Sequence, residues 1–294
     1  MREVDLVERI RKLAESGAHN PTIVRGIGDD CAVVRPQANQ DLVFTTDFVL
    51  EGRHFNLDTH KAADVGHKAL ARSLSDLAAM GSEPAFCLVS LAVPARLAGA
   101  WMQGFYKGLL ALASKYNIAL AGGDLASFDK VVADVICCGS VPRGKALLRN
   151  GAKPGDAIYV TGDLGGSAYG FRVRRGKFWK RHLRPEPLVS QGVILRRAGV
   201  TAALDLSDGL ALDLHRLCLE SNAGAEIDNI PVARGATMED ALHGGEDYEL
   251  LFTAPARKKI PMPAIRIGTI QSGAPGEVRV QGKLIQAKGF EHFR

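Results

Sequence analysis

Short runs rich in β-branched and aromatic residues alternate along this chain with stretches of helical periodicity. Residues 63–80 carry Leu70, Leu74 and Leu77 on one helical face, and residues 97–116 form a second helical stretch. Regular alternation of this kind predicts a mixed α/β (α+β) fold, in which helices cover the faces of a sheet. The expected strands cover residues 41–46, 86–93, 131–141 and 157–162, then 248–253, with shorter candidates at 265–270 and 277–280.

The length of 294 residues favours two domains with separate cores. A break is expected at residues 141–144, where a strand candidate runs into Pro142 and Gly144. We therefore expect an N-terminal domain over residues 1–142 and a C-terminal α/β domain over residues 143–294.

Composition excludes several classes of protein. Hydrophobic residues make up 46% and charged residues 23% of the chain, so extensive disorder is not expected. No apolar run approaches the roughly 20 residues that span a bilayer, and residues 1–15 mix charged and apolar side chains as an amphipathic helix does. The five cysteines form no CxxC pair, which argues against a disulfide framework or a zinc site. We expect a cytoplasmic protein without a membrane partner.

Basic residues concentrate between residues 172 and 184, where they alternate with aromatic ones. A stretch of this composition could bind RNA or a membrane surface, but a solvated loop or helix face is the simpler interpretation. The chain shows no RNA-binding signature, so a nucleic-acid partner is not expected. The residues are Arg172, Arg174, Arg175, Lys177, Phe178, Trp179, Lys180, Arg181, His182 and Arg184.

Carboxylates recur at the junctions between expected elements, often beside glycines that permit a close approach of the backbone. They follow the turn 26–28, end the strand at 41–46, lie late in the helix 63–80 and precede the strand at 248–253. The positions are Asp29, Asp30, Asp47, Asp76, Asp124, Asp205, Asp208, Glu246 and Asp247.

Each junction also has a structural explanation. Adjacent Gly and Asp residues are common in turns, and Gly122-Gly123-Asp124 could be a plain loop. Ser207 or Asp208 could cap the helix that follows, and Arg72 could pair with Asp76 one turn away.

Taken together, the junctions favour a magnesium site. Mg²⁺ prefers a few carboxylates with water and substrate phosphate, whereas the eight histidines form no HExxH set for a nitrogen-rich site. A cluster of carboxylates is costly unless cations occupy it, and bound cations attract phosphate. The P-loop and protein-kinase signatures are both absent. The glycine-rich segment 161–167 could offer backbone N–H groups to phosphate at a helix N-terminus.

Eight segments between residues 26 and 253 resemble, in order, the motifs of the thiamine-monophosphate kinase family. The final GFEHF also resembles the C-terminus of that family. The joint match is highly specific, although GGD or SDG alone would mean little. The segments are GIGDDCAVV, FTTDFVLEGRHF, KALARSLSDLAAMGSEP, AGGDLA, ALLRNGAKPGDAIYVTG, HLRPEP, LDLSDGL and GGEDYELLFT.

The resemblance implies the two-domain fold of aminoimidazole ribonucleotide synthetase. In that fold the N-terminal domain contributes a dimer-forming sheet, so a homodimer is expected. It also implies the reaction of ATP with thiamine monophosphate to give ADP and thiamine diphosphate, with several Mg²⁺ ions as cofactors and ATP as co-substrate.

The resemblance also assigns roles residue by residue. Its metal-binding positions match Asp30, Thr45, Thr46, Asp47, Asp76, Asp124, Asp205 and Asp208. Its nucleotide contacts match Tyr106, Gly123, Asp124, Arg149 and Ser207, and its substrate contacts match His54, Glu246 and Phe290. Asp47, Asp208 and Arg149 are expected to contribute most directly to catalysis.

General chemistry agrees with these roles. A phosphate oxygen is already anionic near neutral pH, so the reaction needs charge neutralisation and positioning more than a strong base. Arg149 could stabilise charge on the transferring phosphate, and the Phe290 ring could stack on a cationic thiazolium. His54 and Phe290 could equally be structural, Phe290 as an apolar anchor of the C-terminal tail.

Two alternatives remain. Another ATP-dependent enzyme of the same superfamily could share the acidic motifs. However, the reactive N-terminal cysteine of selenophosphate synthetase and the C-terminal cysteine of the hydrogenase-maturation relative are both absent. A nonenzymatic nucleotide- or RNA-binding protein would use the basic stretch 172–184 but would leave the carboxylates without a purpose. This stretch is also shorter than the connection that the family often carries.

Overall fold

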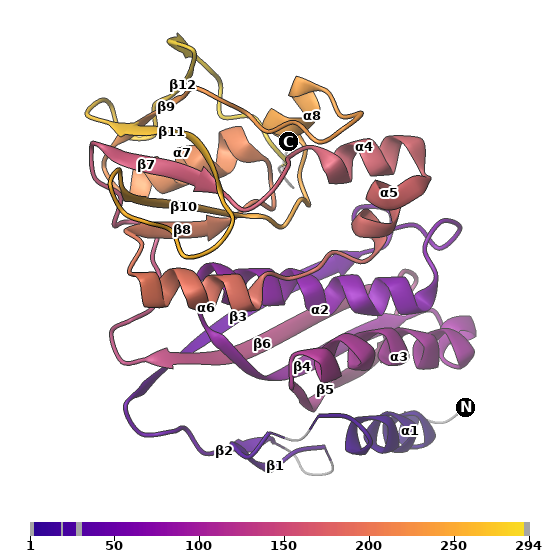
Figure 1. The fold of residues 1–294 in the computed structure, drawn as a ribbon. Helices are drawn as coiled ribbons and strands as arrows, with labels where there is room; N and C mark the ends of the chain where they lie inside the picture. Colours follow the sequence, from indigo (N-terminus) through magenta and orange to yellow (C-terminus); the bar gives the residue numbers. More distant parts are fainter. Residues whose placement is uncertain (1–2, 19, 28–30, 291–294) are drawn as a thin grey trace. The chain divides into compact units, whose positions relative to one another are not determined.

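The computed structural model describes residues 3–18, 20–27 and 31–290. The chain divides into two compact units, which Figure 1 shows in sequence colours. Unit 1 comprises Met1–Leu77 and Ser82–Gly144, and unit 2 comprises Ala78–Gly81 and Lys145–Arg294. No helix in the described part of the chain is both long and apolar enough to cross a bilayer.

Unit 1 is built on a four-stranded sheet in the order β3-β6-β4-β5, in which only β4 and β5 pair in parallel. Helix α2 packs on β6, where the Ser73 hydroxyl donates to the Val135 carbonyl, and α3 contacts β5. The elements are α1 (Glu3–Glu15), β1 (Ile23–Arg25), β2 (Val33–Val34), β3 (Gln40–Leu50), α2 (Ala62–Ala79), β4 (Glu83–Val93), the 3₁₀ turn η1 (Ala95–Leu97), α3 (Ala100–Lys115), β5 (Ala119–Ser127) and β6 (Val132–Pro142).

Strand β3 separates two kinds of side chain because successive residues point to opposite faces of a sheet. Val49 is completely buried, and Thr45 and Asp47 lie on the same face as Val49, where their side chains meet α2. Phe44 and Phe48 lie on the other face and remain 59% and 55% exposed. One face of β3 therefore carries polar groups toward a helix, and the other carries uncovered aromatic rings.

Strand β5 was not expected from the sequence, where Gly122-Gly123-Asp124 was interpreted as a possible loop. The segment instead pairs in parallel with β4, placing Gly123 opposite Val89. A Cβ atom at Gly123 would lie 2.0 Å from the Val89 carbonyl oxygen, and its φ of +156° is one that other residues rarely adopt. Two glycines lower the β-propensity of the segment, which is why the strand was missed.

Unit 2 contains a seven-stranded mixed sheet in the order β13-β12-β9-β11-β7-β10-β8. Helix α7 contacts β8, β9 and β12, and its apolar face joins the main core of the unit. The elements are β7 (Asp156–Val160), α4 (Gly166–Val173), α5 (Gly176–Leu183), α6 (Val189–Ala198), β8 (Ala202–Asp205), α7 (Leu210–Glu220), β9 (Gly224–Ile227), α8 (Met238–His243), β10 (Leu250–Pro255), β11 (Ile265–Gln271), β12 (Val278–Val280) and β13 (Lys283–Leu284).

The mixed α/β class and the expected strands and helices are confirmed, most of them within a few residues of their bounds. All five cysteines are free thiols, and four of them are buried. Burial raises the pKa of the Cys87 and Cys218 thiols to about 12, as expected of cysteines that act as small core residues.

Helices α2 and α3 touch through their backbones at two glycines. A Cβ atom at Gly66 would lie 1.9 Å from the Phe105 carbonyl oxygen, and one at Gly108 would lie 1.9 Å from the Ala63 carbonyl oxygen. A side chain at either position would force the two helices apart.

We predict that Gly108→Ala lowers the free energy of unfolding by about 1–3 kcal/mol, because overpacking outweighs the better helix propensity of alanine. Gly104→Ala is the matched control on the same helix, where the nearest atom to the new Cβ is the Ala62 methyl carbon at 3.0 Å. Thermal and urea unfolding followed by circular dichroism measures both variants. Equal stability of the two would contradict the close helix contact.

Candidate functional site

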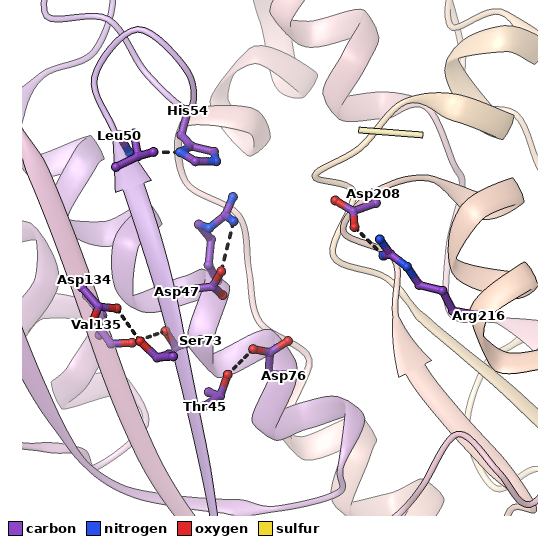
Figure 2. Close-up of polar contacts among 12 residues, drawn as sticks. Thr45, Asp47, Leu50, His54, Ser73, Asp76, Asp134, Val135, Asp208 and Arg216 are labelled. Atoms are coloured by element: carbon purple, nitrogen blue, oxygen red, sulfur yellow. Dashed lines mark hydrogen bonds and ion pairs between the residues drawn. The ribbon is translucent and has the colours of Figure 1, made fainter. Parts of the chain in front are cut away.

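An acidic cluster in unit 1 lies between β3 and α2 (Figure 2). The Thr45 hydroxyl donates to the Asp76 carboxylate, and Arg72 Nη2 lies 3.1 Å from Asp47 Oδ1. Arg72 and Asp76 are one turn apart on α2, so this helix supplies both a cation and a carboxylate to the strand. The sequence suggested that Arg72 could pair with Asp76, and the structure pairs it with Asp47.

Two further expected ligands of unit 1, Thr46 and Asp124, lie on the opposite face of the sheet. Thr46 points away from α2, and its hydroxyl donates to Asp134, a carboxylate that the sequence analysis did not single out. Asp124 pairs in register with Ser90, which in turn pairs with Asp134, so Asp124 lies on this face too. Strand β5 is three strands from β3, or about 14 Å at the usual strand spacing. A single copy of unit 1 therefore does not bring Asp124 to Asp47.

His54 lies in the turn after β3, where hydrogen bonds reach both its ring and its backbone carbonyl. The Leu50 N–H donates to His54 Nδ1 at 3.0 Å, as Figure 2 shows, and the buried Lys68 ammonium donates to the His54 carbonyl at 3.3 Å. Lys68 is fully buried, and no local pattern predicted its contact with His54.

Two expected nucleotide contacts of unit 1 have structural roles in this fold. Tyr106 is only 3% exposed, packs edge-on against Phe105, and has its pKa raised by burial. Gly123 is required by its close approach to β4. Asp30, an expected metal ligand, lies outside the described residues.

In unit 2, backbone hydrogen bonds bring three distant segments together. The Glu246 N–H donates to the Ser207 carbonyl at 2.8 Å, and the Tyr248 N–H donates to the Leu206 carbonyl at 2.9 Å. The Phe290 N–H donates to the Asp208 carbonyl at 3.1 Å. Among the expected site residues of this unit, Ser207, Asp208, Glu246 and Phe290 thus lie on one set of adjoining loops.

The beginning of α7 concentrates negative charge. The Asp213 carboxylate accepts the N–H groups of Asp208 and Gly209, at 2.9 and 3.0 Å, so the possible caps Ser207 and Asp208 are wrong. Burial, followed by repulsion from Asp208 and Asp205, raises the pKa of Asp213 to about 7.

An arginine partly neutralises this cluster. Arg216 Nη1 lies 2.5 Å from Asp208 Oδ2 and 3.1 Å from Asp213 Oδ1. The spacing of Asp213 and Arg216, three residues apart on an amphipathic helix, was the available sequence signal for this pair.

The glycine-rich segment 161–167 forms the expected turn from β7 into α4, with Gly165 at a φ of +81°. Two of its N–H groups are already used, because the Asp247 carboxylate accepts those of Gly165 and Ser167, at 2.5 and 2.9 Å. The positive end of α4 is thus paired with an internal anion. The suggested phosphate-binding role of this turn stays a prediction, with fewer donors than the sequence offered.

Two residues of the basic stretch 172–184 form ion pairs with carboxylates of unit 2. Arg172 forms a two-point ion pair with Asp240, with N···O distances of 2.6 and 2.8 Å. Arg181 Nη2 lies 2.5 Å from Glu249 Oε1 and also donates to the Asp247 carbonyl at 2.8 Å. A uniform solvated face is therefore an incomplete description of the stretch.

Arg149 lies at the other end of α7 from Asp208. Its carbonyl accepts the Ser221 hydroxyl at 2.6 Å, and Ser221 follows the last residue of the helix. The 11 residues of α7 make it about 16 Å long, so unit 2 does not bring Arg149 and Asp208 together. The roles of Arg149 toward nucleotide and in catalysis stay predictions.

The donor chemistry of both acidic clusters suits Mg²⁺. Hydroxyl and carboxylate oxygens are hard ligands of the kind that Mg²⁺ prefers. Across the described residues, no three His, Cys, Asp or Glu side chains form a ready-made metal site.

The buried Asp247 predicts a pH dependence of stability. Burial raises its folded pKa to about 6 from an ordinary value of 3.8, so the folded state holds this proton more tightly than the unfolded state. The contribution of Asp247 to stability therefore falls as pH rises from about 4 to 6. We predict that, in EDTA, wild type loses about 2 kcal/mol relative to Asp247→Asn between pH 4 and 7.

Urea unfolding at a series of pH values measures this difference. Asp163→Asn is the control, because Asp163 is an exposed carboxylate in the same turn and its variant should follow the wild-type profile. If the stabilities of wild type and Asp247→Asn changed with pH in parallel, Asp247 would not be the group with the raised pKa.

Both the sequence and the fold are similar to those of known proteins. Residues 28–144 match the family AIR synthase related protein, N-terminal domain. The chain is 38% identical to thiamine-monophosphate kinase of Salmonella typhimurium, over 91% of each chain. The crystal structure of thiamine-monophosphate kinase from Stenotrophomonas maltophilia is 37% identical, with a TM-score of 0.84 over 97% of this chain and 98% of that one.

A further solved structure, AaThiL complexed with AMPPCP and TMP, is 31% identical, with a TM-score of 0.81 over 100% of this chain and 99% of that one. The fold is therefore the two-domain fold of these kinases, and the expected family is confirmed. The chain belongs to the thiamine-monophosphate kinase family.

Proposed function

We propose that this protein transfers the γ-phosphoryl group of ATP to the phosphate of thiamine monophosphate, giving ADP and thiamine diphosphate. The observation that carries the proposal is the convergence of the LDLSDGL loop, the GGED loop and Phe290 in unit 2. The relative AaThiL, complexed with AMPPCP and TMP, supports an ATP-dependent kinase acting on thiamine monophosphate. The enzyme would act in the cytoplasm.

The chemistry needs little proton transfer. A phosphate oxygen of thiamine monophosphate attacks the γ-phosphorus of ATP in line, and the bond from that phosphorus to the bridging oxygen of ADP breaks. The attacking oxygen is already anionic near neutral pH. The protein therefore has to hold two highly charged phosphates close together and offset their repulsion.

Carboxylates of both units would hold the cations for this task. Mg²⁺, when bound, would supply positive charge that offsets the charge of the two phosphates. Arg72 and Arg216, which pair with Asp47 and Asp208, could then turn toward phosphate oxygens. The proposed ligands are Asp30, Thr45, Thr46, Asp47, Asp76, Asp124, Asp205 and Asp208.

The thiamine part of the substrate has polar and aromatic candidates. The Glu246 carboxylate suits a cationic thiazolium or the amino group of the pyrimidine, and Phe290 offers a partly exposed ring. The hydrogen bond from the Phe290 N–H to the Asp208 carbonyl keeps Phe290 next to a proposed metal ligand. His54 is the proposed substrate contact of unit 1, whereas Tyr106, Gly123, Arg149 and Ser207 are the proposed nucleotide contacts.

A homodimer would complete the acidic site. The face of β3 that carries Leu42, Phe44 and Phe48 is apolar and exposed in one copy. Uncovered apolar faces of this kind are typical of protein interfaces. Thr46 and Asp124 lie on the same face, so the sheet of a second copy could bring further ligands to them.

The alternative of a nonenzymatic RNA-binding protein has less support. Arg172 and Arg181 are used in ion pairs within unit 2, which reduces the free charge of the basic stretch. Relatives at 33–38% identity over nearly the whole chain are thiamine-monophosphate kinases, which disfavours another enzyme of the superfamily.

The proposed activity predicts a direct product test. Purified protein incubated with ATP, Mg²⁺ and thiamine monophosphate should form thiamine diphosphate and ADP in equal amounts, as separated by chromatography. Asp47→Asn and Asp208→Asn should each lower kcat at least about 100-fold, because a lost carboxylate ligand removes several kcal/mol of charge stabilisation.

Asp41→Asn is the matched control on the same strand as Asp47. Its carboxylate accepts the Gly144 N–H at 2.7 Å and is not a proposed ligand, so the variant should keep its activity. Calorimetric titration of Mg²⁺ in the presence of AMPPCP gives a readout besides turnover. Near-normal activity and Mg²⁺ binding in Asp47→Asn or Asp208→Asn would refute that residue's role.

The proposed dimer predicts a change in mass. Light scattering should give twice the chain mass of 31.4 kDa for wild type, and Phe44→Glu combined with Phe48→Glu should give the single chain. Leu284→Glu, an equally exposed apolar position on β13, is the control and should stay dimeric. A wild type that runs as a single chain at all concentrations would rule out the interface.

A further inference from the structure

His182 is a buried polar residue of α5 that the proposed reaction leaves without a role. It is 6% exposed, and its ring is stacked on Trp179 with 5.3 Å between centroids and an interplanar angle of 14°. The Phe171 ring lies against it at 5.2 Å. Packing between two aromatic rings fixes the plane of the imidazole and the direction in which its ring nitrogens point.

The fixed ring directs Nδ1 toward the GGED loop. His182 Nδ1 lies 2.8 Å from Ser167 Oγ and 3.4 Å from Glu246 Oε2. A carboxylate oxygen only accepts hydrogen bonds, so its proximity favours the form of His182 that carries a proton on Nδ1. The imidazole thus shares a hydrogen bond with the Ser167 hydroxyl at 2.8 Å, and the Glu246 carboxylate lies at 3.4 Å as its electrostatic partner.

The backbone of Glu246 is held independently of His182. Its φ is +65°, a left-handed conformation, and its N–H donates to the Ser207 carbonyl. The preceding Gly245 passes so close to this loop that a Cβ atom would lie 2.6 Å from Ser207 O. Because the backbone is held in this way, the freedom that remains to Glu246 lies mainly in its side-chain torsions.

We propose that His182 is a positioning residue, which holds the Glu246 carboxylate in the orientation that contacts the thiamine part of the substrate. This inference rests on the proposed function and extends it from Glu246 to the helix behind it. A glutamate side chain has several rotamers of similar energy, and holding one of them in advance reduces the entropy lost on binding. His182 therefore acts on recognition of thiamine monophosphate and not on ATP.

Two substitutions separate the hydrogen bond from the packing. His182→Phe keeps an aromatic ring between Trp179 and Phe171 but removes the donor. His182→Asn places an amide N–H near the position of Nδ1 but removes the ring. We expect KM for thiamine monophosphate to rise about tenfold in His182→Phe, because the Glu246 carboxylate loses its polar neighbour at 3.4 Å. KM for ATP should stay within about twofold of wild type, and His182→Asn should restore most of the loss.

A double-mutant cycle tests whether His182 acts through Glu246. In an Glu246→Gln background, the added effect of His182→Phe on KM for thiamine monophosphate should shrink to about twofold. Phe178→Leu is the control for destabilisation, because Phe178 is a buried residue of the same helix outside the site. It should lower the melting temperature without changing either KM.

The outcomes are distinct. A tenfold rise confined to KM for thiamine monophosphate, absent from the Glu246→Gln background, supports the inference. An unchanged KM in His182→Phe overturns it, as does an equal rise in both KM values that follows the melting temperature. Absence of thiamine diphosphate in the wild-type reaction would instead refute the proposed function.

Discussion

The backbone hydrogen bonds that join three loops of unit 2 are the constraint on which the candidate site depends. Glu246 bonds to Ser207, Tyr248 to Leu206 and Phe290 to Asp208, although these segments lie about 40 to 80 residues apart in sequence. Glycine makes this possible, since Gly245 leaves no room for a Cβ atom beside Ser207. The candidates Ser207, Asp208, Glu246 and Phe290 thus lie on adjoining loops because their backbones are hydrogen-bonded to one another.

Charge imposes the second constraint. Each unit gathers carboxylates near one helix, and each carries an arginine against them: Arg72 on Asp47 and Arg216 on Asp208. These pairs reduce the repulsion but do not remove it: burial first, and then repulsion from Asp208 and Asp205, raises the pKa of Asp213 to about 7. Clusters that keep surplus negative charge favour a cation, and a bound cation favours phosphate. The same arrangement therefore supports both halves of the proposed reaction.

The alternation of strands and helices was readable from the sequence because periodicity reflects local burial. The four-residue spacing on α2 and the apolar runs of β4 and β6 marked those elements correctly. Strand β5 was missed because its glycines lower the β-propensity of the segment. Gly123 is needed there for a close approach to the backbone of β4, which lies elsewhere in the sequence. The contacts of Asp134, Lys68 and His182 could not be read from local sequence, since their partners lie on other elements. Arg216 differs, because its partner Asp213 is three residues away on the same helix. Motif order identified the family, but pairing across the fold decided which side chains meet.

Asp247 shows how such pairing changes a functional interpretation. A glycine-rich turn between a strand and a helix suggests a phosphate site, because the helix N-terminus offers free N–H groups. Here the Asp247 carboxylate accepts two of them, so α4 is stabilised by an internal anion. The proposed phosphate binding would then draw more on the arginines and cations of the acidic clusters than on this turn. The turn instead fixes the GGED loop, and through it the neighbouring Glu246, against the helices that carry Ser167 and His182.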